Sequence, residues 1–186
     1  MIDDERIIEL FFARSEKAIA ELDVKYGKLF HKLSHNILNN RQDAEECVND
    51  AYLGAWNTIP PTKPNPLQAY VCKIVRNISL KLYYRKEAIK RNSEYDIVIQ
   101  EIEAYISAPN TVETSIETKE LAQIIESFLD TMSEENFVIF MRRYWFSDTY
   151  AEIAKRVGIS EKNVSVRLTR IRKQMREYLI EREVFV

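Results

Sequence analysis

The chain has 186 residues, 46% of them hydrophobic and 30% charged, with three glycines and five prolines. This composition excludes an intrinsically disordered chain and favours helices, because apolar residues are plentiful and helix breakers are few. A formal net charge of −2 is unusual for a nucleic-acid binder, but the local distribution of charge matters more than its sum.

The sequence has neither of the two common signals for export or membrane insertion. No apolar run approaches the roughly 18 residues that a membrane-spanning helix requires. The N-terminus, Met1–Glu5, is acidic where a secretory signal would be basic. We therefore expect a cytoplasmic protein without direct membrane insertion. Cys47 and Cys72 lie outside any C-x-x-C pair, which predicts two buried thiols in a reducing compartment.

In the N-terminal half, apolar side chains recur every three or four residues, which predicts amphipathic helices. This spacing predicts a helix from about Glu16 to Leu38, a turn at 39–41 and a helix over Asp43–Trp56. The proline-rich stretch 59–66 cannot be helical, because proline removes backbone donors and constrains the preceding residue. A further helix is predicted from Pro66 to about Lys90.

Acidic residues predominate from Asn92 to Glu120, where Lys119 alone opposes them. Ser107–Thr111 contains helix-breaking residues that would end any helix formed over Ile97–Ile106. We interpret residues 92–112 as an acidic linker. Beyond it, the spacing of apolar residues predicts helices over 113–131, 134–145, 148–157 and 161–181. Strand-like alternation is absent. The sequence therefore predicts an all-α protein with two small helical domains, residues 1–91 and 113–186.

Residues 150–170 have the pattern of a helix-turn-helix. Ala154 is small where the two helices approach, Gly158 lies where the turn needs a positive φ, and Ser160 is placed as the N-cap of the second helix. Four apolar residues are expected to form the core between the two helices: Ile153, Val157, Ile159 and Val164.

The second helix of this motif is polar and basic on its outward or flanking positions, which are Lys162, Ser165, Arg167, Thr169, Arg170, Lys173 and Arg176. In a helix-turn-helix the second helix enters the major groove, where early residues read bases and basic residues contact phosphates. The pattern therefore predicts DNA binding. An ordinary helical hairpin with a solvated basic face is the alternative.

Residues 150–173 closely resemble region four of the extracytoplasmic-function (ECF) sigma factors of the sigma-70 family, which typically carries an E-I-A…G-I…V-K-S-R-L-x-R-A-R-K string. Asp43–Trp56 resembles the D-A-E-D-L-V-Q-E-x-F-x-x-A-W helix of region two, and Ala69–Asn77 resembles its W-L-x-x-I-A-R-N segment. Three motifs in the family's order are far more specific than a helix-turn-helix alone.

The resemblance implies that the chain binds core RNA polymerase and directs it to promoters. The residues implied in binding the polymerase core are Asp43, Glu46, Asn49, Asp50, Leu53 and Trp56. Those implied in binding the −10 element are Arg76, Asn77, Lys81, Tyr83, Tyr84, Arg85 and Lys86. Those implied in binding the −35 element are Lys162, Asn163, Ser165, Val166, Arg167, Thr169, Arg170 and Lys173.

Physical chemistry agrees with the assignment to the −10 element, because cations follow the phosphate backbone and aromatic rings stack on unpaired bases. The loop 60–65 lies where the family's loop helps to capture a flipped base. For either Tyr83 or Tyr84 alone, a place in the core is as good an interpretation as stacking on a base. Four residues depart from the family's usual types, namely Lys81, Tyr84, Ser165 and Val166. Because base readout depends on individual side chains, the sequence does not predict which promoter sequence the protein prefers.

Other implied partners follow from the family alone. Its members are often held inactive by an anti-sigma factor, and no residue pattern in this sequence indicates one. We expect a monomer when the chain is free. The acidic linker suggests the hypothesis that Glu94, Asp96, Glu101 and Glu103 mimic nucleic acid along a basic channel.

Two other functional classes remain as alternatives. A free-standing helix-turn-helix regulator would bind duplex DNA without polymerase. A metal-dependent helical enzyme would use His31 and His35, spaced i, i+4, together with Glu45 and Glu46. No third histidine, H-E-x-x-H motif, nucleophile elbow or P-loop occurs in the sequence, so we expect no catalytic residue, metal site or cofactor.

Overall fold

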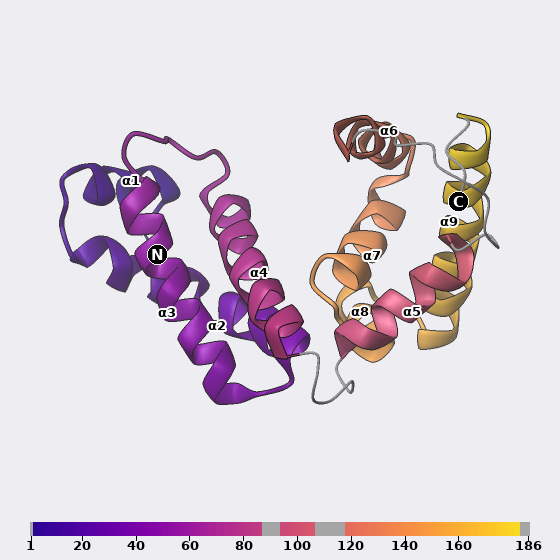
Figure 1. Ribbon diagram of the computed structural model, residues 1–186, viewed down its shortest axis with the longest axis horizontal. Coiled ribbons are helices and arrows are strands. Elements are labelled where there is room, and N and C mark those ends of the chain that lie inside the picture. The colour runs from indigo at the N-terminus through magenta and orange to yellow at the C-terminus, as the bar shows by residue number, and fades with distance from the viewer. Residues whose placement is uncertain (1, 87–93, 107–117, 183–186) are drawn as a thin grey trace. The chain divides into compact units, whose positions relative to one another are not determined.

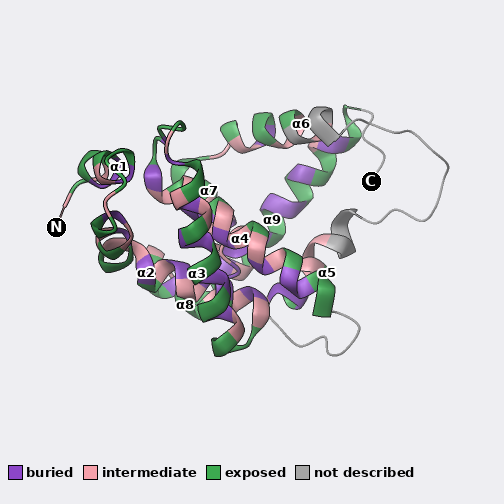
Figure 2. Ribbon diagram, turned by 60° about the vertical axis from the view of Figure 1, so that its left-hand side comes forward, coloured by how far each residue is buried: buried purple, intermediate pink, exposed green. Residues whose placement is uncertain are grey.

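The computed structural model describes residues 2–86, 94–106 and 118–182, and every regular element in these ranges is an α-helix (Figure 1). The predicted all-α class is confirmed. The chain divides into two compact units, Met1–Tyr95 and Asp96–Val186, which we call unit 1 and unit 2. Buried and exposed residues alternate along the helices, as amphipathic packing requires (Figure 2). None of the described helices is both long enough and apolar enough to span a bilayer.

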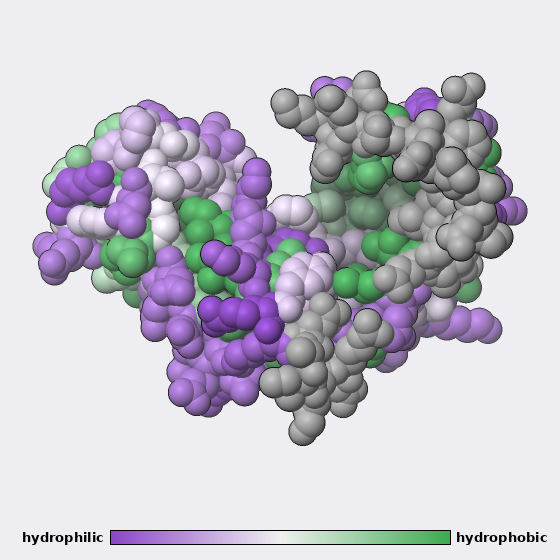
Figure 3. All heavy atoms as spheres, in the orientation of Figure 1, coloured by the Kyte–Doolittle hydropathy of each residue, from purple (hydrophilic) through white to green (hydrophobic). Residues whose placement is uncertain are grey.

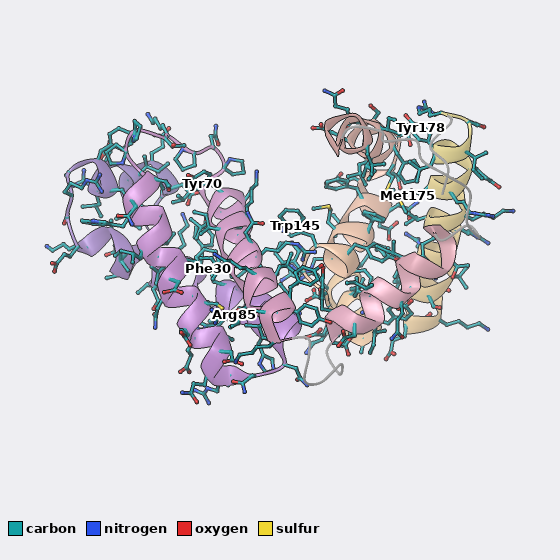
Figure 4. All side chains as sticks on the ribbon, in the orientation of Figure 1. Phe30, Tyr70, Arg85, Trp145, Met175 and Tyr178 are labelled. Carbon is teal, nitrogen blue, oxygen red and sulfur yellow. The ribbon has the colours of Figure 1, made fainter. Side chains whose placement is uncertain are left out.

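Unit 1 is a bundle in which α2 (Lys17–Leu38), α3 (Arg41–Thr58) and α4 (Leu67–Lys86) pack against one another, while α1 (Asp4–Phe12) packs on α2. Phe30 of α2 is fully buried and is labelled within this bundle in Figure 4. Other fully buried side chains of unit 1 include Leu22, Ile37, Val48, Leu67 and Val75. Cys47 and Cys72 are both buried, as predicted.

The predicted turn at 39–41 is shorter in the structure, because two consecutive asparagines cap both helices. Asn39 adopts a left-handed conformation with φ 49°, and its N–H donates to the carbonyl of His35. The side chain of Asn40 accepts a hydrogen bond of 3.0 Å from the N–H of Asp43. Arg41 is therefore already the first residue of α3.

Helix α1 is absent from the elements that the sequence predicts. Its signals are local: Asp3 accepts a hydrogen bond from the N–H of Arg6 and caps the helix, and Ile7, Ile8 and Phe11 are its buried residues. The helix has only nine residues, which are too few for the spacing of apolar side chains to predict a helix by itself. Its stability comes from packing on α2.

Gly27 permits a close approach of α3 to α2. A Cβ atom at Gly27 would overlap Oδ1 of Asp23 and would lie 3.3 Å from the hydroxyl of Tyr52. That hydroxyl donates a hydrogen bond of 2.6 Å to Asp23, and burial together with this bond raises the pKa of Tyr52. The missing side chain therefore makes room for a helix–helix hydrogen bond, which offsets the cost of about 1 kcal/mol that glycine brings to a helix.

The described core of unit 2 is formed by α6 (Thr118–Asp130), α7 (Glu134–Tyr144), α8 (Tyr150–Val157) and α9 (Glu161–Ile180), with a contribution from α5 (Glu94–Ile106). Met175 and Tyr178, labelled in Figure 4, lie on α9. The ring of Tyr178 packs 5.3 Å from that of Phe128 on α6. The core of buried residues includes Phe128, Ile139, Phe140, Tyr144, Ile153, Val164, Leu168, Ile171, Met175 and Leu179.

Part of the predicted acidic linker is a packed helix. Residues 94–106 form α5 (Glu94–Ile106), and the division between the units falls within it, after Tyr95. Val98 is 2% exposed and belongs to the core of unit 2, and Ile102, one turn later, packs against the same core. Spacing of i, i+4 gives α5 an apolar stripe, which the excess of acidic residues conceals in the sequence. Residues 107–111 lie outside the described ranges.

Replacing Phe30 with alanine should lower the free energy of unfolding of unit 1 by about 3–5 kcal/mol, because it leaves a cavity in a fully packed core. Urea unfolding followed by far-ultraviolet circular dichroism measures this change. Val24→Ala is the matched control on the same helix, since Val24 is 79% exposed and its truncation should change the free energy by less than about 0.5 kcal/mol. Equal effects of the two substitutions would contradict the packing described for α2.

Candidate nucleic-acid interface

The first helix of the helix-turn-helix, α8, begins at a capping box. The hydroxyl of Thr149 accepts a hydrogen bond of 3.2 Å from the N–H of Glu152. In return, the N–H of Thr149 donates a hydrogen bond of 3.0 Å to the carboxylate of Glu152. Two backbone donors that a helix N-terminus leaves unsatisfied are thereby paired, so the start of α8 is defined by its own side chains.

The turn between α8 and α9 has the geometry that the sequence predicts. Gly158 has φ 78°, and its N–H donates to the carbonyl of Ala154. Ser160 caps α9 by accepting a hydrogen bond of 3.2 Å from the N–H of Asn163. The predicted positive φ at Gly158 and the predicted N-cap at Ser160 are both confirmed. The two helices share buried Ile153 and Val164, both 0% exposed, while Val157 and Ile159 are partly buried against the same core.

The outer face of α9 carries most of the residues predicted to contact DNA. Lys162, Asn163, Val166, Thr169, Arg170 and Lys173 are exposed, and Ser165 and Arg167 are half-buried. Arg167 forms an ion pair of 2.6 Å with Glu135 at the start of α7. Within the described part of the chain, neither Lys162 nor Arg170 has an acidic side chain at ion-pair distance. Of the α9 cations predicted to contact DNA, these two therefore have no ion pair among the described residues that a phosphate would have to replace.

A buried polar network lies beneath the helix-turn-helix, and the sequence analysis did not identify it. The carboxylate of Glu101 accepts two hydrogen bonds from Arg143, of 2.6 and 3.1 Å, and one of 3.1 Å from the hydroxyl of Tyr150. Arg172 of α9 lies 3.4 Å from the same carboxylate and donates a hydrogen bond of 2.8 Å to the hydroxyl of Tyr144. Burial raises the pKa of Tyr144 to about 12.

The C-terminal half of α4 (Leu67–Lys86) forms a second basic surface in unit 1. Asn77, Lys81, Arg85 and Lys86 are exposed, and Figure 4 labels Arg85 close to the C-terminal end of the helix. Arg76 is half-buried: its guanidinium lies 5.7 Å from the centre of the Tyr95 ring, and burial lowers the pKa of Arg76.

Tyr83 and Tyr84 have different environments although they are neighbours. Tyr83 is 8% exposed and packs edge-to-face on Tyr95, with ring centres 5.2 Å apart, whereas Tyr84 is 55% exposed. Tyr83 also packs edge-to-face on Tyr84 at 5.4 Å. The ring of Tyr84 is therefore exposed and that of Tyr83 is buried. Tyr83 is a core residue, which was the alternative interpretation from the sequence.

The predicted polymerase surface lies on α3, where Glu46, Asn49 and Asp50 are exposed and Leu53 is 57% exposed. Figure 3 shows hydrophilic side chains covering much of the visible side of this helix. Trp56 is half-buried, with the Arg14 guanidinium 5.5 Å from its ring centre. Asp43 differs from the others, because it is paired with Lys86 of α4 at 2.6 Å and its side chain is 18% exposed.

A groove of about 790 Å³ runs between α2 and α3 beside this surface. Asn49, Leu53 and Trp56 line it from α3, and Ile19, Ala20, Asp23 and His31 line it from α2. The groove therefore combines apolar walls with a polar rim. Among the described residues, no three or more His, Cys, Asp and Glu side chains are grouped as metal ligands.

Comparison with known families identifies both units. Residues 22–89 match the family "Sigma-70 region 2", and residues 122–175 match the family "Sigma-70, region 4". The two ranges together include more than half of the chain, in the order that the sequence motifs predicted. The chain belongs to the sigma-70 family.

Among individual proteins, the chain is similar to the ECF RNA polymerase sigma factor SigE of Mycolicibacterium smegmatis, with 22% identity over 86% of this chain. The chain spans 60% of the length of that relative. Among solved structures, it is similar to CnrH, determined in complex with the cytosolic domain of CnrY, with 18% identity and a TM-score of 0.45. That comparison covers 96% of this chain and 97% of the CnrH chain.

Gly158→Ala should lower the free energy of unfolding of unit 2 by about 1–2 kcal/mol, because a side chain disfavours the left-handed conformation. No atom lies within 4 Å of the position that a Cβ would take, so the loss is one of backbone conformation and not of crowding. Thermal unfolding measures it. Gly158→Asn is the control: asparagine tolerates this conformation better and should lose less. Equal losses for alanine and asparagine would contradict this explanation.

Proposed function

We propose that this protein is a sigma factor that binds core RNA polymerase and directs it to promoters. The observation that carries the proposal is the presence, in one chain and in the family's order, of a region 2 bundle and a region 4 helix-turn-helix. Each has a cationic helix with exposed side chains, α4 in unit 1 and α9 in unit 2. A duplex-binding regulator without polymerase would need the second of these helices only.

In unit 2, the proposed contact is between α9 and the −35 element. Lys162, Asn163 and Ser165 lie in the first turns of α9, which is where a recognition helix reads base edges. Arg170 and Lys173 lie further along and are placed to contact phosphates. Arg167 must exchange Glu135 for a phosphate before it contributes, so its net contribution should be smaller than that of Arg170.

In unit 1, the proposed contact is between the C-terminal half of α4 and the −10 element. Tyr84 offers an exposed ring between the cations Lys81 and Arg85. A ring beside cations suits an unpaired base next to its phosphate, and such stacking is worth about 1–3 kcal/mol per base. Tyr83 supports the ring of Tyr84 by edge-to-face contact and is too buried to stack on a base.

For core polymerase, the proposed contact is the exposed side of α3 and the adjoining groove. Leu53 and Trp56 supply apolar area, and Glu46 and Asp50 supply negative charge beside it. Interfaces of this kind use an apolar centre for affinity and charged surroundings for orientation. By resemblance to the family, the partner surface is the clamp helices of the largest polymerase subunit.

The polymerase is the catalyst in this proposal, and the chain itself performs no reaction. The decisive experiment mixes the purified chain with core RNA polymerase and genomic DNA and maps the 5′ ends of the transcripts. New start sites that share −10 and −35 sequences are the expected result. If the chain binds duplex DNA but neither binds core polymerase at micromolar concentration nor changes any start site, it is a free-standing regulator.

Arg170→Ala should weaken binding to a −35 duplex and reduce the slope of log K against log salt concentration by about 0.9, because one phosphate contact is lost. Fluorescence anisotropy over a series of salt concentrations measures both quantities. Lys28→Ala is the control, since Lys28 is an exposed cation of α2 outside the proposed DNA surfaces. A slope unchanged in Arg170→Ala would show that another face of α9 meets the DNA.

The double substitution Glu46→Ala/Asp50→Ala should reduce the affinity for core polymerase about tenfold or more, since charge pairs at an interface contribute on the order of 1.5 kcal/mol or more each. Helicity should be unchanged, because both side chains are exposed. Glu5→Ala/Glu9→Ala on α1 removes the same charge elsewhere on unit 1 and should leave the affinity intact. Equal affinities for both double variants would remove this face of α3 from the interface.

A further inference from the structure

Unit 2 contains a site that binds a carboxylate, and the carboxylate comes from a residue outside the range that matches sigma-70 region 4. Glu101 belongs to α5, whereas the match begins at residue 122. Its carboxylate contacts Arg143 of α7, Tyr150 of α8 and Arg172 of α9. One carboxylate therefore contacts all three helices, whereas the Arg167–Glu135 ion pair and the Arg172–Tyr144 hydrogen bond join only α9 and α7.

We propose that Arg143, Tyr150 and Arg172 form a carboxylate site into which α5 inserts Glu101, and that this insertion positions α8 and α9 for binding to DNA. The second half of the proposal rests on the proposed function, since it concerns the −35 contact. Glu101 is thus a positioning residue: it acts on the DNA surface through Arg172 and Tyr150.

Charge and burial give the first argument. The side chains of Arg143 and Arg172 are 3% and 7% exposed, and that of Glu101 is 19% exposed. A guanidinium withdrawn from water to this degree is strongly disfavoured when its counter-charge is removed. Arg143 meets the carboxylate through Nε and Nη2 together, which is the bidentate geometry that fixes orientation as well as distance.

The hydrogen bonds of Arg172 give the second argument. Its Nη2 donates to the hydroxyl of Thr169 at 3.0 Å, and that hydroxyl donates to the carbonyl of Ser165 at 2.9 Å. Thr169 and Ser165 are both predicted to contact DNA. A continuous chain of hydrogen bonds therefore runs from Glu101 through Arg172 to the exposed Thr169 and ends on the backbone carbonyl of Ser165.

The contact to α8 gives the third argument. Tyr150 is the first residue of α8, and its hydroxyl donates to Glu101 while its ring lies 4.9 Å from the Arg143 guanidinium. The same carboxylate is thus connected to the start of the first helix of the motif and to the middle of the second. Both connections constrain the angle between the two helices.

The test uses Glu101→Ala in the full chain, with chemical rescue by formate. All variants carry Trp56→Phe, so that Trp145 of unit 2 is the one remaining tryptophan and its fluorescence reports the unfolding of that unit. Glu101→Ala should lower the unfolding temperature of unit 2 by about 10 °C. It should also weaken binding to the promoter duplex found by start-site mapping by about tenfold, which corresponds to about 1.4 kcal/mol.

Formate should reverse both losses in Glu101→Ala, since it supplies a carboxylate of the right size, whereas chloride at equal ionic strength should not. Glu126→Ala is the matched control: Glu126 is an exposed carboxylate on α6, and its loss should change neither quantity and create no response to formate. Glu101→Gln is the second variant. It keeps the shape of the side chain without its charge, and it allows the measurements if the alanine variant does not fold.

Each outcome decides one part of the proposal. The carboxylate site is overturned if both Glu101 variants unfold at the same temperature as the parent chain, which carries Trp56→Phe alone. It is also overturned if formate and chloride restore a lowered unfolding temperature equally. A loss of stability reversed by formate, together with DNA binding that never changes, overturns the positioning role alone. If the parent chain itself binds no promoter duplex, the proposed function fails, while the response of the unfolding temperature to formate still decides whether the site exists.

Discussion

The Glu101 carboxylate meets two guanidinium groups that are almost entirely withdrawn from water. Buried arginines are costly without an anion, so α7 and α9 cannot pack as they do unless a carboxylate reaches the space between them. The apolar core of unit 2 sets which faces of the helices are inside. The charged contact sets how they are oriented, because a bidentate ion pair is directional and apolar packing is not. In our proposal, this contact also positions the side of α9 that carries the residues predicted to contact DNA.

Local signals explain what the sequence predicts well. Gly158 and Ser160 identify the turn and the cap within a few residues, because positive φ and capping are properties of single positions. The position of Arg172 could also have been found, since it lies one turn after Leu168 and next to Ile171, on the buried side of α9. The role of Glu101 could not, because its partners are 42 and 71 residues away in the sequence.

The two adjacent tyrosines of α4 show a different limit. Neighbouring residues of a helix differ by about 100° in direction, so Tyr83 and Tyr84 could not both face the same environment. The buried series Leu67, Val71, Val75 and Ser79 continues to Tyr83 at the same spacing of four residues, so the helical period favours Tyr83 as the inner residue. The α4 sequence gives no sign of Tyr95, which follows the helix in the chain and supplies the ring against which Tyr83 packs. The residues predicted on α3 are mostly exposed as expected, but the groove beside Leu53 and Trp56 depends on α2 and has no signature in the α3 sequence.

The ion pair between Asp43 and Lys86 joins two proposed binding surfaces of unit 1, because Asp43 belongs to the polymerase side and Lys86 to the DNA side. If Lys86 binds a phosphate as proposed, Asp43 loses its internal partner, and its carboxylate becomes available to a cation on the polymerase. Binding of either macromolecule then favours binding of the other by the same factor, as thermodynamic reciprocity requires. A single surface contact would in this way make promoter engagement and enzyme engagement cooperative.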